Sequence, residues 1–355
     1  MSRKAVVISL RFNPGFLQTL IGYAKALGEL GIATEFLANP LYERYDEITE
    51  VAPLIAYRGD EVFNGWDIAI FLNPSVDNYK LGRQLKARGT KILYVYHEPW
   101  QLSLNYIRHE GLIGSAKAAA AHRATVPLLK LADRVLLPSK TALEVYGRAD
   151  ARHNSHALYF PLVFEDQAPK SMTDVLEQKR YFSFIGNPCR SHGFDHYIAA
   201  IRYGILAGHE TEYMIASRFP ISKAVLRDPV LRENSHRIEI RCGRPLSEEE
   251  INGCFAASFC VWNLYRRTTQ SGVLPKAFMF GTPVIASSIG SFPEYVRDGW
   301  NGRFADVRGL DNVWGAVEEM RRNLSSFSTN CRSTFRDVFY YRSNVGALEA
   351  IIDAL

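Results

Sequence analysis

The segment from Ser271 to Gly302 constrains the fold of this chain more than any other stretch, and it consists of SGVLPKAFMFGTPVIASSIGSFPEYVRDGWNG. The small pair Ser271-Gly272 precedes an apolar segment with helical spacing, and a Gly281-Thr282-Pro283 turn follows it. The run Val284-Ile285-Ala286 is typical of a buried strand, and after a second turn Pro293-Glu294 begins a short helix. The order helix, turn, strand, turn, helix predicts half of a Rossmann-type unit.

The start of the apolar helix suits an anion. Ser271 and Gly272 place backbone N–H groups at a helix N-terminus, where the helix dipole also attracts negative charge. A diphosphate is a natural ligand for such a place. The alternative is an ordinary α/β packing unit in which the glycines serve only the turns, and the local pattern leaves both interpretations open.

Strand-like and helix-like segments alternate along the first half of the chain. The expected strands are short and apolar: Ala5–Leu10, Ile32–Leu37, Asp67–Leu72, Ile92–Tyr96 and Arg134–Leu137. The expected helices between them are Phe16–Leu30, Tyr79–Arg88, Ser115–Leu131 and Ser139–Tyr146. Strands that alternate with helices predict a parallel sheet with helices on both faces.

The polar segment Glu165–Gln178 contains a proline and interrupts this alternation, so we interpret it as a linker. The pattern then restarts, with strands expected at Tyr181–Ile185, Glu212–Ala216, Ile238–Arg241 and Phe259–Trp262 and helices at His196–Ala207 and Ser247–Ala257. A final helix is expected over Val338–Leu355. Two βαβ series joined by one linker, in a chain of 355 residues, predict two Rossmann-like domains.

Composition limits the classes of function. The 42 basic and 37 acidic residues give a net charge of +5, which is too weak to indicate nucleic acid and suits an anionic substrate or membrane surface. The five cysteines include no CxxC pair, which favours a reducing compartment and argues against a zinc site. With no signal-peptide pattern and no apolar run of about 18 residues or more, we expect a cytoplasmic protein.

Three motifs of the C-terminal segment carry a family resemblance: GTPVIAS from Gly281, GSFPE from Gly290 and VRDGWNG from Val296. Together they resemble the C-terminal signature of GT-B glycosyltransferases, and most closely the retaining group called family 4. The ungapped similarity runs from about Thr268 to Gly302, and weaker similarity covers nearly the whole chain. The resemblance implies transfer of a sugar from a nucleotide-diphosphate sugar to a saccharide or lipid-linked acceptor.

The resemblance also implies an α/β fold in which two Rossmann-like domains face each other across a cleft, with a C-terminal helix crossing back to the first domain. Residues 1–165 would form the N-terminal acceptor-side domain, 166–178 the linker, 179–337 the nucleotide-sugar-binding domain and 338–355 the helix that packs on the N-terminal domain. The family usually needs no metal, because cationic side chains and helix N-termini neutralise the leaving diphosphate. We therefore expect no metal or cofactor, and a UDP- or GDP-sugar as donor.

The loop after the strand Tyr181–Ile185 is the first candidate for the diphosphate site, since ligands of open α/β sheets bind beyond the carboxyl ends of the strands. The family usually carries an Arg just after the glycine of this loop and a Lys just before its second glycine. Asn187 and His192 stand there instead, and Arg190 between them is expected to supply the missing charge as a catalytic residue. The alternative is a turn with exposed polar residues.

A second loop, Cys242–Leu246, contains Gly243 and matches the region that faces the nucleotide base in the family. Three glutamates follow Ser247. They are better explained by the capping of a helix start than by catalysis.

The segment from Tyr265 to Gly272 shows the largest departure from the family, which places two glutamates eight positions apart here, one on the donor sugar and one on the ribose. The matching positions are Thr268 and Lys276. Thr268 still offers a hydroxyl to the sugar, whereas the ammonium of Lys276 only donates hydrogen bonds and is expected at the phosphates or packed by its aliphatic stem. The other donor-binding candidates in this part of the chain are Arg266, Ser271, Gly272, Val273 and Glu294.

In the first domain, Gly15 matches a glycine-rich loop of the family that approaches donor and acceptor. His97 follows the strand Ile92–Tyr96, where family members often have a histidine near the transferred sugar, and it is the second catalytic candidate. Glu98 is either its carboxylate partner or a solvated loop charge. The segment Gly111–Leu131 is either an ordinary surface helix or a place of peripheral contact with the inner face of a membrane or with a lipid-linked acceptor.

The leading hypothesis is a metal-independent hexosyltransferase of bacterial surface polysaccharide or glycolipid synthesis, with retention of configuration implied by the resemblance alone. One alternative is a non-catalytic nucleotide-sugar sensor or scaffold, which the missing glutamates favour. Another is a sugar-nucleotide epimerase on the same fold, for which the chain offers no convincing pair of acid–base carboxylates.

Overall fold

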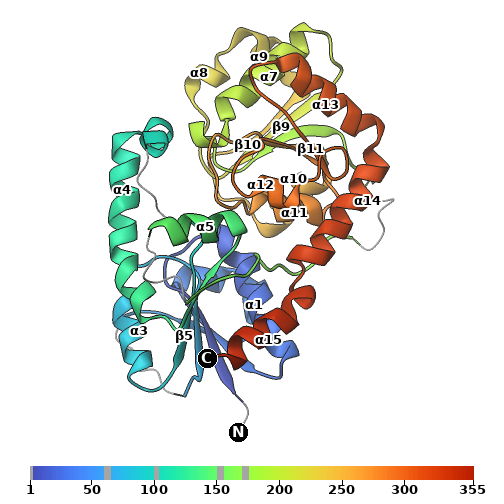
Figure 1. Cartoon of the computed structure of the whole chain (residues 1–355). Helices are drawn as coiled ribbons and strands as arrows, with labels where there is room; N and C mark the ends of the chain where they lie inside the picture. Colours follow the sequence, from blue (N-terminus) through green and yellow to red (C-terminus); the bar gives the residue numbers. More distant parts are fainter. Residues whose placement is uncertain (1–2, 60–64, 100–103, 150–155, 170–175) are drawn as a thin grey trace. The chain divides into compact units, whose positions relative to one another are not determined.

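The computed structural model describes residues 3–59, 65–99, 104–149, 156–169 and 176–355, and Figure 1 colours them along the chain. The chain divides into two compact units. Unit 1 consists of Met1–Glu165 together with Asp337–Leu355, and unit 2 of Asp166–Arg336. Each unit is an α/β structure built on one parallel sheet, so the predicted α/β class with two Rossmann-like domains is confirmed. Residues 170–175 of the predicted linker lie outside the described residues.

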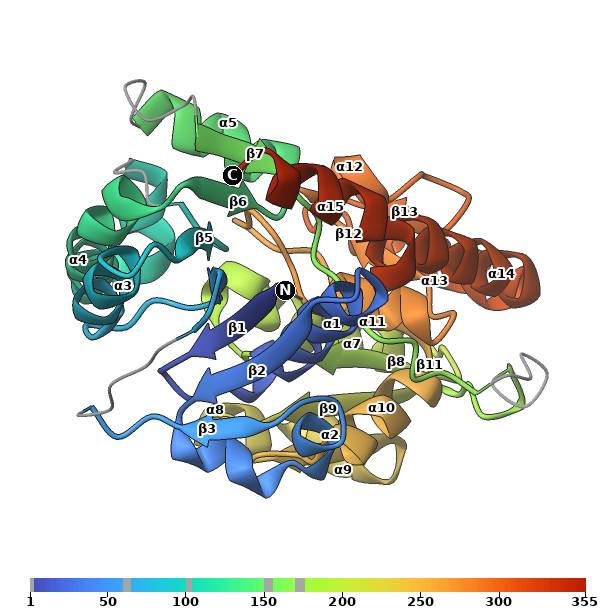
Figure 2. The same cartoon turned by 90° about the horizontal axis from the view of Figure 1, so that it is seen from below.

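The described residues of unit 1 form a seven-stranded sheet with the order β3-β2-β1-β4-β5-β6-β7. Its strands are β1 (Lys4–Ser9), β2 (Ala33–Ala38), β3 (Leu54–Ala56), β4 (Ile68–Phe71), β5 (Lys91–Val95), β6 (Arg134–Leu137) and β7 (Ala157–Tyr159). Val7 of β1 pairs with Phe36 on one side and with Ile70 on the other. Figure 2 shows β1, β2 and β3 side by side. The strand order reverses at β1, and the carboxyl ends of β1 and β4 therefore flank the place where ligands bind in such sheets.

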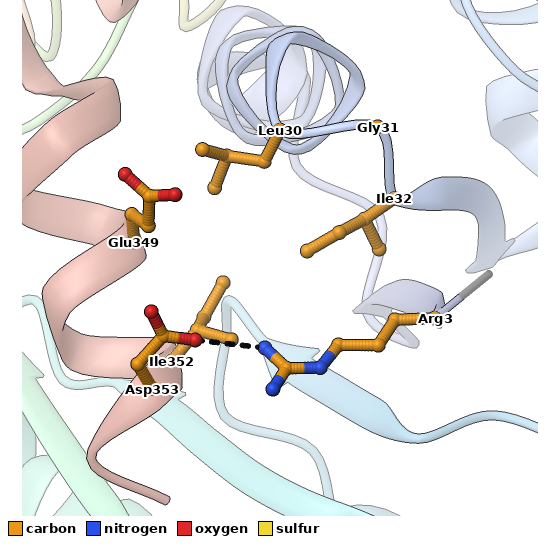
Figure 3. Close-up of a pocket in the computed structure, with 7 residues that line it drawn as sticks. All are labelled: Arg3, Leu30, Gly31, Ile32, Glu349, Ile352 and Asp353. Carbon is orange, nitrogen blue, oxygen red and sulfur yellow. Dashed lines mark hydrogen bonds and ion pairs between the residues drawn. The ribbon is translucent and has the colours of Figure 1, made fainter. Parts of the chain in front are cut away.

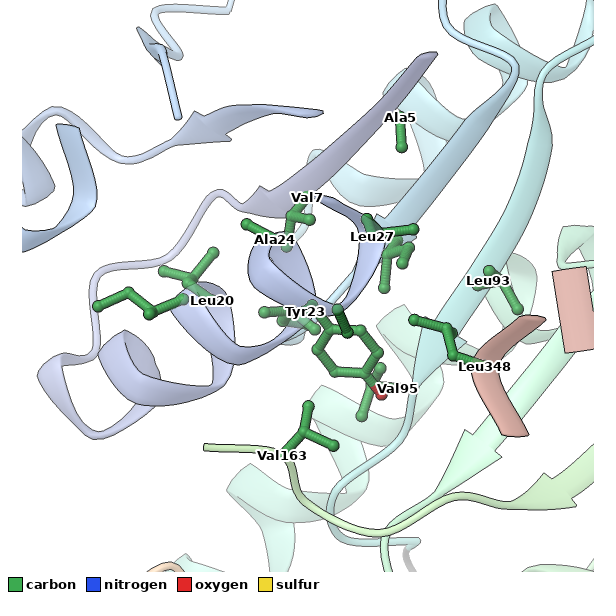
Figure 4. Packing of buried hydrophobic residues seen from close by; sticks show 14 of the residues in the cluster. Ala5, Val7, Leu20, Tyr23, Ala24, Leu27, Leu93, Val95, Val163 and Leu348 are labelled. Atoms are coloured by element: carbon green, nitrogen blue, oxygen red, sulfur yellow. The ribbon is translucent and has the colours of Figure 1, made fainter. Parts of the chain in front are cut away.

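Both faces of this sheet are covered, which explains why its strands are apolar almost throughout. Figure 4 shows α1 (Leu17–Glu29) on one face, where Tyr23 and Leu27 pack with Val95. Leu348 of α15 (Val345–Asp353) joins the same core from the far end of the chain. The opposite face carries a second apolar cluster, which includes Tyr94, Phe71 and Leu128.

The remaining helical elements of unit 1 are η1 (Pro14–Phe16), η2 (Pro40–Arg44), α2 (Asp46–Thr49), α3 (Asn78–Lys86), α4 (Leu104–Leu131) and α5 (Lys140–Ala149). Helix α4 begins earlier than predicted and kinks at Gly111, which has a φ of 72° and a ψ of 176°. Such a conformation is open to glycine and unfavourable for other residues. Figure 1 shows α3 lying beside α4.

The C-terminal segment is helical over a shorter range than Val338–Leu355, because α15 begins only at Val345. A π-helical turn, Phe335–Phe339, and a 3-10 turn, Tyr341–Asn344, precede it. Phe164 donates its N–H to the Phe339 carbonyl at 2.8 Å and accepts from the Tyr341 N–H at 3.0 Å, so these backbone groups pair with another segment instead of continuing a helix. Helix α15 packs against α1 within unit 1.

The described residues of unit 2 form a six-stranded sheet with the order β10-β9-β8-β11-β12-β13. Its strands are β8 (Tyr181–Ile185), β9 (Glu212–Ser217), β10 (Ile238–Cys242), β11 (Ser258–Asn263), β12 (Val284–Ala286) and β13 (Gly302–Phe304). The helical elements are η4 (Arg190–His192), α7 (Phe194–Leu206), α8 (Lys223–Leu226), α9 (Pro229–Glu233), η5 (Ser235–Arg237), α10 (Glu248–Ala256), α11 (Val273–Met279), α12 (Phe292–Tyr295), α13 (Leu310–Arg322) and α14 (Leu324–Thr334). The sequence patterns predicted β8 to β12 within one or two residues at each end and missed the short β13.

Large aromatic side chains fill the core of unit 2. Trp262 of β11 and Trp314 of α13 are almost completely buried, and the Trp314 Nε1–H donates to the Ala200 carbonyl at 3.0 Å. Gly204 of α7 lies directly over the Trp314 ring, where an added Cβ would approach a ring carbon to 2.0 Å. Helix α7 therefore packs closely on α13 because residue 204 has no side chain. In the described part of the chain, no helix is long and apolar enough to cross a membrane.

Candidate functional site

Three loops meet at the carboxyl edge of the unit 2 sheet. They leave β8, β11 and β12, which are neighbours in the sheet. Contact between the loops is direct: a Cβ on Gly193 would lie 2.3 Å from the Leu264 carbonyl oxygen, and one on Gly290 would lie 1.9 Å from the Thr268 carbonyl oxygen. Both glycines have positive φ, 67° and 57°. Only glycine combines a positive φ with the absence of a Cβ, so the close approach of the loops depends on glycine at these two positions.

The first loop, residues 186–193, turns sharply away from β8. Gly186 has a φ of 136°, and Asn187 is exposed. The 3-10 turn η4 then presents Arg190 at the surface, and its guanidinium has no hydrogen-bond partner among the residues that the structure describes. Arg190 is therefore a cation available to a ligand at this edge, and its contact with a diphosphate stays a prediction.

His192, in the same loop, stacks on Tyr265 with ring centroids 4.3 Å apart and ring planes 7° from parallel. Burial raises the pKa of Tyr265, and a hydrogen bond with the Ser271 side chain works in the opposite direction. The tyrosine therefore stays a neutral phenol. Through these contacts, Tyr265 joins the loop after β8 to the segment that begins α11.

Arg266 has a different environment from Arg190. Its guanidinium makes two hydrogen bonds of 2.6 Å to the carboxylate of Asp195 and a third, also of 2.6 Å, to the Arg190 carbonyl. It also contacts Nε2 of His196 at 2.6 Å. Burial by itself would raise the pKa of Asp195, but the hydrogen bonds and charge of Arg266 outweigh it and lower that pKa. The pKa of His196 is lowered, first by burial and then by the charge of Arg266.

The structure thus gives Arg266 partners within the protein, and its contact with a donor stays a prediction. These partners come from the 3-10 turn η4 and from the first turn of α7, so Arg266 holds Arg190 and the start of α7 in place. A bidentate arginine–carboxylate pair is geometrically demanding and suits such a positioning role.

Thr268 and the start of α11 lie beside each other at the end of the second loop. Thr268 is buried, and its hydroxyl donates to the Gln270 carbonyl at 2.6 Å. Gly272 is exposed at the N-cap position of α11 with no side-chain cap, and Ser271 and Val273 flank it. The third loop ends at α12, whose first turn carries the half-buried Glu294.

Lys276 occupies a buried position in α11, with the side chain only 10% exposed. It pairs with Glu248, the first residue of α10, and donates to Oδ1 of Asn252 at 2.9 Å. A phosphate would therefore have to compete with the Glu248 carboxylate for the Lys276 ammonium. Burial of the side chain favours the other expectation, that Lys276 packs by its aliphatic stem.

The glutamates at the start of α10 have separate roles. Glu250 completes a capping box with Ser247, as the sequence indicated, and also pairs with Arg244. Those contacts lower its pKa to about 2. Glu248 instead turns toward α11. Gly243, in the preceding loop, is exposed and has a φ of 92°.

In unit 1, the carboxyl ends of β1, β4 and β5 carry buried neutral polar groups. His97 is only 8% exposed and packs edge-on against Phe16, with ring centroids 4.5 Å apart. Burial lowers its pKa to about 4, although a hydrogen bond to the Leu72 carbonyl opposes this. Nε2 of His97 is buried with no hydrogen-bond partner in the described residues. This unprotonated nitrogen can accept a hydrogen bond from a ligand.

Other groups near these strand ends were not expected from the sequence. Gln18 of α1 is 2% exposed, and neither end of its amide has a hydrogen-bond partner among the described residues. Asn73, just after β4, donates to Ser9 Oγ at 2.8 Å and to the Arg11 carbonyl at 2.6 Å. In unit 2, Asn263 ends β11 with both amide atoms buried and without a hydrogen-bond partner among the described residues. The sequence signal for Asn263 is an asparagine at the end of an apolar strand run, and it was not included among the predicted site residues.

Gly15 lies in η1, and its N–H donates to Oδ1 of Asn13 at 3.2 Å. Glu98 is exposed next to His97. Among the residues that the structure describes, no group of three or more His, Cys, Asp or Glu side chains could hold a metal ion.

A shallow cavity of about 130 Å³ lies at the other end of the unit 1 sheet, near the amino ends of β1 and β2. Figure 3 shows it between Leu30, Ile32 and α15, with an exposed ion pair of 2.9 Å from Arg3 to Asp353. The strand-end loops do not reach this side of the sheet, so it is not the candidate site.

Two comparisons with known protein sequences gave one match, which lies in unit 2. Residues 179–323 match the family model of glycosyl transferases group 1, which covers most of unit 2. A search of curated protein sequences found no match.

Solved structures are similar over the whole chain at low sequence identity. Alr3699/HepE from Anabaena, in complex with UDP and glucose, has a TM-score of 0.72 and 13% identity over 99% of this chain and 100% of its own. A TarM variant from S. aureus, in complex with fondaparinux, α-GlcNAc-glycerol and UDP, has a TM-score of 0.70 and 9% identity over 98% and 99%. A putative UDP-N-acetylglucosamine 2-epimerase from Listeria monocytogenes has a TM-score of 0.66 and 13% identity over 100% and 96%. The chain therefore has the GT-B fold, which glycosyltransferases and this epimerase share.

Proposed function

We propose that this chain, a GT-B protein whose second unit matches glycosyl transferases group 1, transfers a sugar from a UDP-sugar to a saccharide acceptor. One observation carries the proposal. The loops after β8, β11 and β12 converge within the matched domain and present Arg190 with no partner among the described residues. A loop edge with a cation and backbone N–H groups suits a diphosphate.

The donor is proposed to be a UDP-sugar and not a GDP-sugar, because the structures of HepE and TarM contain UDP. Its diphosphate would lie against the 186–193 loop and the residues Ser271 to Val273, with Asn187 and His192 at the side of Arg190. The base would face the loop that contains Gly243. Thr268 would meet the sugar through its hydroxyl, at the cost of its present bond to the Gln270 carbonyl.

In the proposed transfer, the bond between the anomeric carbon and the diphosphate oxygen breaks, and its electron pair leaves with UDP. The acceptor hydroxyl loses its proton and forms the new bond to the anomeric carbon. Arg190 and the backbone N–H groups stabilise the charge that develops on the departing diphosphate, so that no metal ion is required. Retention of the anomeric configuration belongs to the proposal through the family resemblance.

His97 is proposed to orient the transferred sugar. Because its pKa is lowered to about 4, the ring is neutral at physiological pH. Its buried Nε2 would then accept a hydrogen bond from a sugar hydroxyl, which would satisfy a nitrogen that has no partner among the described residues. Gly15 would allow the first loop to approach the same ligand.

The acceptor is proposed to belong to bacterial surface polysaccharide or glycolipid synthesis, with a hexose as the transferred sugar. TarM's complex with fondaparinux and α-GlcNAc-glycerol supports a saccharide acceptor. Peripheral membrane contact would use the exposed face of α4, where Leu112 and Ile113 are 75% and 74% exposed and Lys117 and Arg123 are also exposed. Exposed leucine and isoleucine beside basic side chains suit an anionic bilayer surface.

The test is incubation of the purified chain with a panel of UDP- and GDP-sugars, scored separately for binding and for release of the nucleoside diphosphate. We expect binding and slow hydrolysis of one UDP-sugar, unchanged by EDTA. Activity that EDTA removes and Mg²⁺ or Mn²⁺ restores would contradict the role given to Arg190. Binding without any turnover would instead identify a nucleotide-sugar sensor, a reading that Thr268 and Lys276 favour because neither is a carboxylate.

A further inference from the structure

Glu248 and Lys276 form an ion pair whose side chains are only 11% and 10% exposed. A network holds the ammonium: Lys276 donates to Asn252 Oδ1 at 2.9 Å, and Asn252 Nδ2 donates to Gln167 Oε1 at 3.1 Å. Removing two charges from water is costly, and such a pair adds little to stability compared with apolar side chains of the same size. The pair therefore calls for a reason other than stability.

Only one of the two carboxylate oxygens of Glu248 has a hydrogen-bond partner among the described residues. Its Oε1 accepts from Lys276, while Oε2 accepts no hydrogen bond from any residue that the structure describes. A carboxylate has acceptor capacity on both oxygens, and Oε2 is not among the fully buried atoms without a partner, so a ligand can reach it. Oε2 is therefore a place for a hydrogen-bond donor from a ligand.

The charges around Oε2 restrict what that ligand group can be. A phosphate would be repelled by the carboxylate, and a cation would be repelled by the ammonium of Lys276 next to it. A neutral donor such as a hydroxyl group avoids both effects. The pair as a whole is neutral, so binding a hydroxyl changes no net charge.

The position of the pair also fits a particular hydroxyl. Lys276 follows Gly272 by one turn of α11, which separates them by about 6 Å along the helix axis. A ligand group beside Lys276 would therefore lie about 6 Å from a phosphate at Gly272, which is about the width of a sugar ring. In a nucleoside diphosphate, the group at this distance from the phosphate is the ribose.

We propose that Glu248, oriented by Lys276 and Asn252, accepts a hydrogen bond from a ribose hydroxyl of the donor nucleotide and selects a ribonucleotide over a deoxyribonucleotide. The proposal rests on the proposed function, because it assigns a contact within the same donor site. Glu248 is a specificity residue that touches the ligand, and Lys276 is a positioning residue that acts through it.

The experiment compares the affinities of the intact chain for UDP and for 2′-deoxy- and 3′-deoxy-UDP by titration calorimetry. We expect the wild type to bind UDP about tenfold or more tightly than one of the deoxy analogues, as for a hydrogen bond to a charged group. In the variant Glu248→Gln with Lys276→Met, which removes both charges together, this ratio should fall by about threefold or more, because a neutral amide oxygen accepts a weaker hydrogen bond than a carboxylate, while affinity for the deoxy analogue is kept. Glu248→Gln alone should give the same result if the double variant does not fold.

Glu249→Gln is the matched control, since Glu249 is the exposed neighbour on the same helix, and its UDP to deoxy-UDP ratio should equal that of the wild type. An unchanged ratio in a folded Glu248 variant would show that the pair is structural only. Equal binding of UDP and both deoxy analogues by the wild type would also overturn this inference while leaving the proposed function intact. No binding of any UDP species or UDP-sugar would overturn both.

Discussion

The carboxyl ends of the two sheets share a buried neutral amide, Asn73 in unit 1 and Asn263 in unit 2, but they differ in the other polar groups placed there. In unit 1, the buried polar side chains near these strand ends are neutral, namely His97, Asn73 and Gln18. In unit 2 the corresponding loops carry charge: Arg190 is exposed, and Arg266 is paired with Asp195. Two parallel sheets of similar topology thus present different surfaces to a ligand.

The difference follows from the free-energy penalty of burying a neutral polar group compared with that of burying a charge. A neutral amide or imidazole can be buried with one lone pair left open, at a modest penalty that a ligand hydroxyl removes. A buried charge requires an opposite charge, and in unit 2 Arg266 and Lys276 are paired with Asp195 and Glu248. We infer that unit 1 is suited to hydroxyl groups and unit 2 to a diphosphate, and the predictions below test that contrast.

The largest effect is expected where the unit 2 loops touch. Gly290→Val would place Cβ against the Thr268 carbonyl at a positive φ, so we expect a loss of stability of about 3 kcal/mol or more. Gly272→Ala is the control, because nothing lies within 4 Å of its Cβ position and its φ is −73°. Thermal unfolding of both variants measures the difference. Equal melting temperatures would mean that the loops need no such close contact.

The second prediction concerns charge at the start of α11. Gly272→Asp should weaken UDP binding by about a hundredfold, or about 2.7 kcal/mol, because it sets a carboxylate against the diphosphate. Gly272→Asn has nearly the same shape without the charge and should lose far less affinity. Calorimetric titration of the folded variants gives the comparison. If the two variants bind UDP equally, the diphosphate does not lie at this helix start.

The third prediction uses the neutral character of the unit 1 site. The folded-state pKa of His97, about 4, lies below its ordinary value of 6.5, so the unfolded chain binds more protons between these two pH values. This contribution to stability is therefore complete above about pH 6.5 and decreases as the pH falls, by about 2 kcal/mol between pH 7 and pH 5. Denaturant unfolding of the whole chain at the two pH values measures it.

His97→Gln is the matched variant for this test, since glutamine does not titrate. The free energy of unfolding of this variant should change by about 2 kcal/mol less between pH 7 and pH 5 than that of the wild type. Parallel pH profiles for the two proteins would show that His97 titrates normally and that the unit 1 site is not neutral by burial.

The smallest effect separates the two arginines. Arg190→Met should reduce UDP affinity by about tenfold with no change in melting temperature, because its guanidinium is exposed and would meet the phosphates directly. Arg266→Met should lower both affinity and melting temperature, since it removes the partner of Asp195. An Asp195→Asn variant with normal UDP affinity would contradict the positioning role of Arg266.

The local sequence was sufficient for the elements but not for their partners. Strands β8, β11 and β12 were predicted because each contains an apolar run between turn residues, and the capping box of α10 because Ser247 and Glu250 are three residues apart. Arg266 was expected at a donor because its position at a strand end was known, while Asp195 lies 71 residues away. The C-terminal helix was expected to be longer because its pairing with Phe164 could not be anticipated from either segment alone.

The sequence by itself determined two series of parallel strands, the glycine turns between Ser271 and Gly302 and the resemblance to GT-B glycosyltransferases, because each depends on residues close together in the chain. Only the tertiary structure decided which charges are available. Lys276 and Glu248 are separated by β11 and the loop after it, and they meet because α10 leads into β11, α11 connects β11 with its neighbour β12, and the two helices contact each other. Charges act over a few ångströms in space whatever their separation in sequence, so their pairing follows from the fold and not from spacing along the chain.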